Sequence, residues 1–217
     1  MKANTFYANL QECVKGKEIK VLSCDFFDTL MSRRVARPAD IFLIVGECIL
    51  MAGNFSFNVT PSRFQALRVQ AEARARKQGP LVEIGIADIY AQFPDGFFRC
   101  PIQNVIDLEI AIEKEFLFPV AEMVDLLRIA ARRGKKIIVV SDIYYNGEHL
   151  KEFWGNTTPG IDIQFFTSCD YKSGKYDRLF EVVLKKLGLS AGAVLHTGDN
   201  YVSDVSRPAS FGIKTAF

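Results

Sequence analysis

Acidic residues follow two apolar segments of this chain. Asp25 comes directly after IKVLSC, and Asp28 lies three residues later. Asp199 comes directly after AVLHTG, and Asp204 lies five residues beyond it. Carboxylate oxygens are ligands that Mg²⁺ prefers, and a carboxylate can also act as a nucleophile. These residues indicate metal binding or covalent catalysis if the fold brings them together, although Asp25 taken alone could equally be a helix cap.

Two further segments carry groups that could hold an anion. Ser141 ends the apolar run KIIVVS and is followed by Asp142. Lys172 and Lys175 flank a Ser-Gly pair in YKSGKYDRLF. Hydroxyl and ammonium groups donate hydrogen bonds to the oxygens of a phosphoryl or carboxylate group. The chain therefore carries both candidate nucleophiles and candidate anion-binding groups.

The elements that must position these groups are short apolar runs separated by segments of helical period. The runs cover residues 19–24, 136–141, 163–167, 193–198 and 212–217. Strands that alternate with helices predict an α/β fold, a Rossmann-like parallel sheet with helices on both faces. In such sheets the ligand crevice lies outside the carboxyl ends of the strands. Asp25, Ser141 and Asp199 are all delivered to that edge.

The region from about residue 33 to residue 118 lacks strand signals. Its periodicity and its prolines predict helices at 38–50, 61–78, 84–92 and 102–118. We therefore expect an α/β core of residues 1–32 and 120–217, interrupted by an all-helical cap of residues 33–119. Within 61–78, Arg68, Glu72 and Arg76 share one face. We expect a solvated charge ladder there, with an arginine that reaches an anionic substrate as the alternative.

Taken in order, the four segments resemble the motifs of the haloacid dehalogenase-like (HAD) hydrolase superfamily, in its helical-cap (C1-type) form. The resemblance covers residues 17–30 and 134–217. It implies that Asp25 attacks phosphorus to form an aspartyl-phosphate and that Ser141 holds the phosphoryl group. It also implies that a lysine neutralises charge, and the family's usual spacing favours Lys175 over Lys172.

The resemblance further implies a magnesium site and a set of substrate contacts. The implied ligands of Mg²⁺ are Asp25, the backbone carbonyl of Phe27, Asp199 and Asp204. We expect substrate contacts from residues within or just beyond the same motifs, namely Thr29, Arg33, Asp142 and Asn200. At most one of the adjacent Tyr144 and Tyr145 is expected to face the site. His196, inside an apolar run, is interpreted as a core histidine with satisfied hydrogen bonds.

The first motif departs from the phosphatase pattern DxDx[TV]. The second Asp of that pattern protonates the leaving group, and here the position is Phe27. Asp28, one residue on, should point the other way. A general acid contributes about 10²–10⁴-fold, so we expect slow turnover of alkyl phosphates or a requirement for good leaving groups.

Dehalogenases of this superfamily also carry an aromatic residue at the position of Phe27, but they normally lack the GDxxxxD segment kept here. The acidic pair therefore favours phosphoryl chemistry. A dehalogenase-like hydrolase and a catalytically weak metal- or ligand-binding protein stay open as alternatives. A narrower bacterial group of HAD hydrolases is also similar, with a D-x-F-D-T-L first motif that appears here in DFFDTLMSR, together with SDIYYN and the segment 37–42.

Composition excludes several classes of protein. The chain has 27 Lys and Arg against 25 Asp and Glu, a net charge of +2, so nothing favours nucleic-acid binding. The longest apolar run, residues 41–53, is too short to span a bilayer and contains Glu47. Five irregularly spaced cysteines without a CxxC pair indicate a reducing compartment. We expect a cytoplasmic, Mg²⁺-dependent monomer or homodimer that acts on a small phosphorylated metabolite such as a sugar phosphate or nucleotide.

Overall fold

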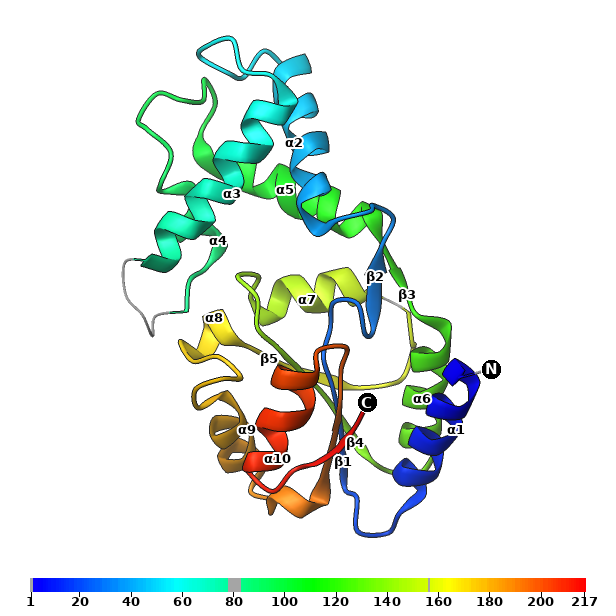
Figure 1. Cartoon of the computed structure of the whole chain (residues 1–217). Coiled ribbons are helices and arrows are strands. Elements are labelled where there is room, and N and C mark those ends of the chain that lie inside the picture. Colours follow the sequence, from blue (N-terminus) through cyan, green and yellow to red (C-terminus); the bar gives the residue numbers. More distant parts are fainter. Residues whose placement is uncertain (1, 78–82, 156) are drawn as a thin grey trace. The chain divides into compact units, whose positions relative to one another are not determined.

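The computed structural model describes residues 2–77, 83–155 and 157–217. The chain forms two compact units. The core unit comprises Met1–Ser32 and Pro119–Phe217, and the helical unit comprises Arg33–Phe118. Figure 1 shows the sheet and its helices in the core unit and the helices of the helical unit.

The core unit is built on a five-stranded sheet in the order β5-β4-β1-β6-β7. All neighbouring strands in it are parallel. The strands are β1 (Val21–Cys24), β4 (Lys136–Ser141), β5 (Ile163–Thr167), β6 (Val194–Thr197) and β7 (Lys214–Ala216). The central strands β1 and β6 are buried at every residue, as continuous apolar runs predict. The predicted α/β class is confirmed.

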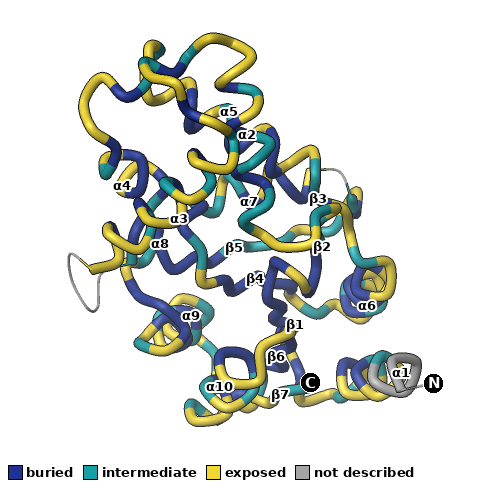
Figure 2. Tube along the Cα trace, turned by 45° about the horizontal axis from the view of Figure 1, so that its top comes forward, coloured by how far each residue is buried: buried dark blue, intermediate teal, exposed yellow. Residues whose placement is uncertain are grey.

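Helices cover both faces of this sheet. They are α1 (Lys2–Lys15), α6 (Ala121–Arg132), α7 (Gly147–Trp154), α8 (Ser168–Tyr171), α9 (Leu179–Leu187) and α10 (Arg207–Ser210). In Figures 1 and 2, α9 and α10 lie on one side of the sheet and α1 and α6 on the other. On the α9 side, Phe180 and Val183 pack against Val21, Ile138 and Val194 of three strands.

The strand order places a topological switch point between β1 and β6. After β1 the chain builds β4 and then β5 outward on one side, and it then returns to add β6 and β7 on the other side. Ligands of open α/β sheets bind at the carboxyl ends of the two strands that flank such a switch. Asp25 follows β1 and Asp199 lies just beyond β6, so the candidate residues stand at the expected place.

The helical unit contains a short 3₁₀ turn and α-helices of 5 to 17 residues. These are η1 (Pro38–Asp40), α2 (Ile41–Met51), α3 (Pro61–Lys77), α4 (Ile86–Tyr90) and α5 (Ile102–Phe116). The predicted helix 102–118 is too long, because Leu117 is extended (φ −84°, ψ 146°) and begins a strand. That strand, β3 (Leu117–Pro119), forms a two-stranded sheet with β2 (Met31–Arg33). Gln78, the predicted end of helix 61–78, lies outside the described residues.

Arg68 corrects the predicted charge ladder on α3. Its side chain is fully buried, and its guanidinium donates to both carboxylate oxygens of Glu109, at 2.8 and 2.7 Å. The Tyr90 hydroxyl donates to the same carboxylate at 2.6 Å, and the Phe42 ring centroid lies 4.4 Å from the guanidinium. The i,i+4 pairs of the predicted ladder do form along α3. The predicted exposure is wrong for Arg68, because helices pack on this face of α3 and a buried charge needs a hydrogen-bonded partner of opposite charge.

No helix among residues 2–77, 83–155 and 157–217 has both the length and the apolar character that a membrane span requires.

Candidate active site

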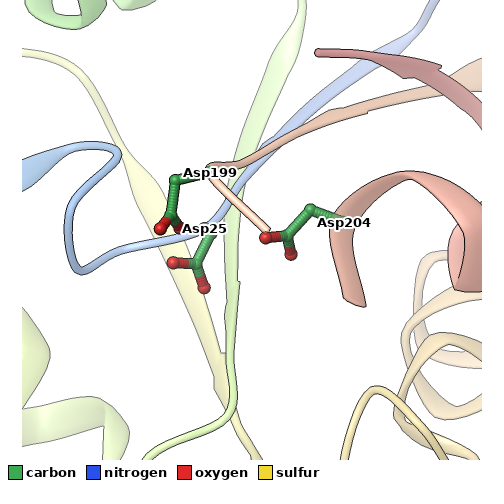
Figure 3. Close-up of side chains that lie close together, drawn as sticks. All are labelled: Asp25, Asp199 and Asp204. Atoms are coloured by element: carbon green, nitrogen blue, oxygen red, sulfur yellow. The ribbon is translucent and has the colours of Figure 1, made fainter. Parts of the chain in front are cut away.

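Three carboxylates gather at the switch point of the sheet. Asp25, Asp199 and Asp204 each offer one oxygen, and these oxygens all lie within 4.8 Å of one another. Figure 3 shows the three side chains close together, each from a different segment of the chain. Asp204 comes from the one-turn helix η3 (Val202–Ser206). The fold thus joins the first and fourth motifs into one acidic site.

Lys175 lies among these carboxylates. Its buried ammonium donates to Asp25 Oδ1 and to Asp204 Oδ1, each at 2.6 Å. The backbone N–H of Lys175 donates to Asp142 Oδ1 at 2.7 Å, which ties the lysine segment to the end of β4. Lys172 is exposed and lies in the left-handed backbone region (φ 50°). The structure therefore brings Lys175, and not Lys172, to the acidic site.

The charges of the site depend on one another. Burial raises the pKa of Asp25, although the nearby Lys175 opposes this shift. Burial also acts to raise the pKa of Asp204, but hydrogen bonds from His196 and Lys175 overcome it and hold that pKa well below its ordinary range. Burial lowers the pKa of His196, which keeps this ring neutral. Burial also raises the pKa of Asp199. When all three carboxylates are ionised, the one ammonium leaves an excess of two negative charges.

This donor set fits a hard divalent cation such as Mg²⁺. The available ligands are carboxylate oxygens, which Mg²⁺ prefers, and the excess charge equals that of the ion. Asp204 is already held on both oxygens, since its Oδ2 also accepts from the backbone N–H of Asn200 at 3.1 Å. A carboxylate fixed in this way can bind the ion directly or through a water molecule.

Phe27 fills the position where phosphatases with the DxDx[TV] motif carry their acid. Its ring is 9% exposed and packs edge-on against Phe26, with centroids 5.0 Å apart. The rings of Tyr145 and Phe153 lie 6.2 and 6.5 Å away. Asp28, at φ 57°, adopts the left-handed conformation and is exposed. The space around position 27 is therefore aromatic.

Thr29 carries an orphaned hydroxyl. The residue is buried, and its Oγ1 has no hydrogen-bond partner within the part of the chain that the structure describes. Thr29 also lines a cavity of about 150 Å³ together with Tyr7, Asp28 and Asp199. A buried hydroxyl without a partner is costly, so a water molecule or a ligand atom is the natural occupant of this position.

Comparison with solved structures identifies the fold of this chain. No family model and no curated protein matches the chain. Among solved structures, an HAD phosphatase from Thermococcus onnurineus matches with a TM-score of 0.61 and 14% identity, over 91% of this chain and 85% of the other. A 2-haloacid dehalogenase from Pseudomonas syringae matches at 0.59 and 17%, over 91% and 85%. The chain has the haloacid dehalogenase-like fold.

A third structure with the HAD fold is a hydrolase from Bacillus subtilis described as bound to magnesium. It matches with a TM-score of 0.57 and 14% identity, over 92% of this chain and 88% of the other. The structures with this fold thus include both phosphatases and dehalogenases. Identities this low establish the shared HAD fold, and the reaction has to be argued from the site itself.

The predicted catalytic residue Ser141 and the predicted substrate-binding residue Asn200 lie in different surroundings. Ser141 is buried at the end of β4, where it pairs in register with Thr167. The side-chain oxygen of Asn200 accepts from the backbone N–H groups of Val202 and Ser203, so it serves the turn that carries Asp204. The roles of Ser141 and Asn200 toward substrate stay predictions.

Arg33, the predicted substrate contact, belongs to the helical unit. Its Nε donates to Glu113 Oε1 at 2.7 Å, and both side chains are at least nine-tenths buried. This ion pair uses the Nε–H of Arg33 as a hydrogen-bond donor. Its predicted contact with substrate stays a prediction.

Sequence reasoning missed two polar residues that support the acidic site. His196 is buried with satisfied hydrogen bonds, as expected of a core histidine, but one of its partners is Asp204, at 3.2 Å from Nε2. The other is Ser23, whose Oγ lies 2.7 Å from Nδ1. The sequence did contain a signal for this contact, because Ser23 and His196 are polar residues inside two mostly apolar predicted strands.

Proposed function

We propose that this chain is a Mg²⁺-dependent HAD-type phosphohydrolase or phosphotransferase that acts on a small phosphorylated metabolite. The observation that carries the proposal is the contact of Asp25 with Lys175 at 2.6 Å, beside the carboxylates of Asp199 and Asp204. A buried nucleophile next to a fixed cation and a divalent-metal site suits the transfer of a dianionic group. The similarity to a phosphatase and to a magnesium-bound hydrolase supports it.

Asp25 is the nucleophile in this proposal. One of its carboxylate oxygens forms a bond to phosphorus, and the bond between phosphorus and the leaving oxygen breaks. Water then attacks the aspartyl-phosphate, which releases inorganic phosphate and restores Asp25. Asp25, Asp199, Asp204 and the backbone carbonyl of Phe27 would hold Mg²⁺, which offsets the repulsion between the carboxylate and the phosphoryl group.

Fixed donors stabilise the transferred group. Lys175 favours the ionised form of Asp25, opposing the rise in pKa that burial causes, and would donate to a phosphoryl oxygen. Ser141, at the end of β4, supplies a hydroxyl to the same group. The orphaned hydroxyl of Thr29 is the third donor in reach of an added ligand. Donors that are already oriented cost no reorganisation during the reaction.

Phe27 determines which substrates suit the site. The leaving oxygen has no carboxylic acid at this position, so it departs as an anion or takes a proton from water. We infer that substrates with good leaving groups, such as aryl or acyl phosphates, turn over faster than alkyl phosphates. The missing acid corresponds to about 10²–10⁴-fold.

A dehalogenase-like hydrolase is the second candidate. The aromatic residue at position 27 and the similarity to a 2-haloacid dehalogenase favour it. In that reaction Asp25 displaces halide from carbon and forms an ester. The acidic excess of the site favours the first candidate, because halide displacement gives no role to three carboxylates around a cation site.

A substrate panel separates the candidates. Phosphate release from aryl, acyl and sugar phosphates is measured with Mg²⁺ and with EDTA, beside chloride release from 2-chloropropionate. We expect phosphate release that requires Mg²⁺ and disappears in Asp25→Asn. Halide release that persists in EDTA would replace this proposal with the second candidate. A chain without either activity that still binds Mg²⁺ and BeF₃⁻ would be a ligand-binding protein of this fold.

A further inference from the structure

A series of buried, hydrogen-bonded polar side chains connects the central strands β1 and β6 to the acidic site. Ser23 Oγ lies 2.7 Å from His196 Nδ1, and His196 Nε2 lies 3.2 Å from Asp204 Oδ1. Asp204 Oδ1 in turn accepts from Lys175, which also contacts Asp25. Ser23 and His196 are 1% and 0% exposed, so bulk solvent does not reach either side chain.

The strand register places Ser23 beside His196. Residues 23 and 196 are direct partners in the parallel pair β1–β6, and both side chains leave the sheet on the same face. The edge of the His196 ring meets Phe180 of α9, with centroids 5.1 Å apart and planes at 80°. Hydrogen bonds at both nitrogens and this packing leave the ring one orientation.

The contacts also determine which ring nitrogen carries the proton. An ionised Asp204 can only accept, so His196 Nε2 must carry the hydrogen and donate it. Nδ1 of the neutral ring then accepts, and the Ser23 hydroxyl donates to it. Asp204 therefore selects the Nε2–H tautomer, and Ser23 supports it by donating to Nδ1.

We propose that Ser23 and His196 are positioning residues that fix the Asp204 carboxylate for the metal ion and for Lys175. This inference rests on the proposed function for its metal, whereas the hydrogen bonds among Ser23, His196 and Asp204 involve only groups of the chain itself. Neither residue reaches the reacting atoms. Groups that orient a metal ligand in this way typically matter by 10–100-fold in metal affinity.

The test compares four variants of the full chain. His196→Leu removes both hydrogen bonds, His196→Gln keeps a donor at the place of Nε2, and Ser23→Ala removes only the hydroxyl that donates to Nδ1. Val194→Ala is the matched control, because residue 194 is a buried apolar residue of the same strand. Mg²⁺ binding is measured by calorimetry, the His196 tautomer by ¹⁵N NMR without metal, and the Asp204 position by crystal structures.

We expect the Nε2–H tautomer in the wild-type chain and also in Ser23→Ala, because Asp204 accepts from Nε2 in both. Mg²⁺ affinity should fall about 10–100-fold in His196→Leu, fall less in Ser23→Ala, recover in His196→Gln and stay unchanged in Val194→Ala. If His196→Leu does not fold, Ser23→Ala, which adds no bulk, carries the test. Wild-type Mg²⁺ affinity in Ser23→Ala and in every folded His196 variant overturns the inference, as does an Nδ1–H tautomer in the wild type.

A wild-type chain that binds no Mg²⁺ would overturn the proposed function. The inference would then be tested only by the measurements made without metal. In that case the contact of Asp204 with Lys175, 2.6 Å in the wild type, should be kept in Val194→Ala and lost in His196→Leu. An unchanged contact in His196→Leu would show that the histidine does not position Asp204.

Discussion

Gly198 and Asp204 approach each other so closely that only glycine fits at position 198. A β-carbon there would lie 2.4 Å from both Cγ and Oδ2 of Asp204. This distance is far inside van der Waals contact, and Asp204 is held in place by Lys175, His196 and the N–H of Asn200. The glycine between β6 and Asp199 therefore makes room for a carboxylate of the proposed metal site.

Gly198→Ala should displace Asp204 and weaken Mg²⁺ binding by at least about tenfold, with a similar loss of turnover. Calorimetric titration with Mg²⁺ measures the affinity. Gly192→Ala is the matched control, because a β-carbon at residue 192 meets no atom within 4 Å. It should change stability by about 0.5 kcal/mol or less. Unaltered Mg²⁺ affinity in Gly198→Ala would contradict the proposed role of Asp204.

Lys175→Met should destabilise the metal-free protein by about 3–5 kcal/mol, because it leaves Asp25 and Asp204 buried without their cation. Added Mg²⁺ should restore part of this loss, since the ion supplies the missing positive charge. Urea unfolding with and without Mg²⁺ measures both effects. Lys172→Met, at an exposed position, should stay within about 0.5 kcal/mol of the wild type. The assignment of the lysine would be reversed if Lys172→Met lost activity and Lys175→Met kept it.

Phe27→Asp should raise the turnover of alkyl phosphates, because it supplies an acid where the leaving oxygen has none. The gain is expected to approach about 10²-fold. Loss of the ring from its contacts with Phe26 and Tyr145 should cost about 3–5 kcal/mol of stability. Phe27→Leu serves as control, because it also removes the ring but adds no acid. If Phe27→Asp folds, binds Mg²⁺ and shows no gain over Phe27→Leu, the account of the missing acid is wrong.

Arg68→Met should destabilise the protein by about 3–5 kcal/mol, because it removes the guanidinium that neutralises the buried Glu109. Arg68→Met combined with Glu109→Leu should recover much of this loss, since no charge then stays buried. A double-mutant cycle by urea unfolding measures the coupling. Arg76→Met, in the exposed pair with Glu72, should cost about 0.5 kcal/mol or less. Additive effects of the two buried substitutions would show that this ion pair contributes no coupling.

Much of the sheet could be predicted from local patterns. The strands at residues 136–141 and 163–167 have the predicted bounds, because each is an apolar run that ends at a polar residue. The predicted helix 102–118 extends too far, since nothing local signals that Leu117 turns into a strand. Arg68 was misplaced for a related reason: its charge suggests solvent, and only the packing of α3 in the helical unit shows that Glu109 accompanies it into the interior.

The sequence by itself determined which chemical groups this protein can use and that Asp25, Ser141 and Asp199 stand at strand ends, because side-chain type and strand periodicity are local properties. Only the tertiary structure decided between Lys172 and Lys175, and only it joined Ser23, His196 and Asp204 into one hydrogen-bonded line. These contacts depend on the parallel register of β1 and β6 and on the return of the lysine segment to the sheet edge. Such distances arise from packing between residues far apart in the chain, which no local pattern encodes.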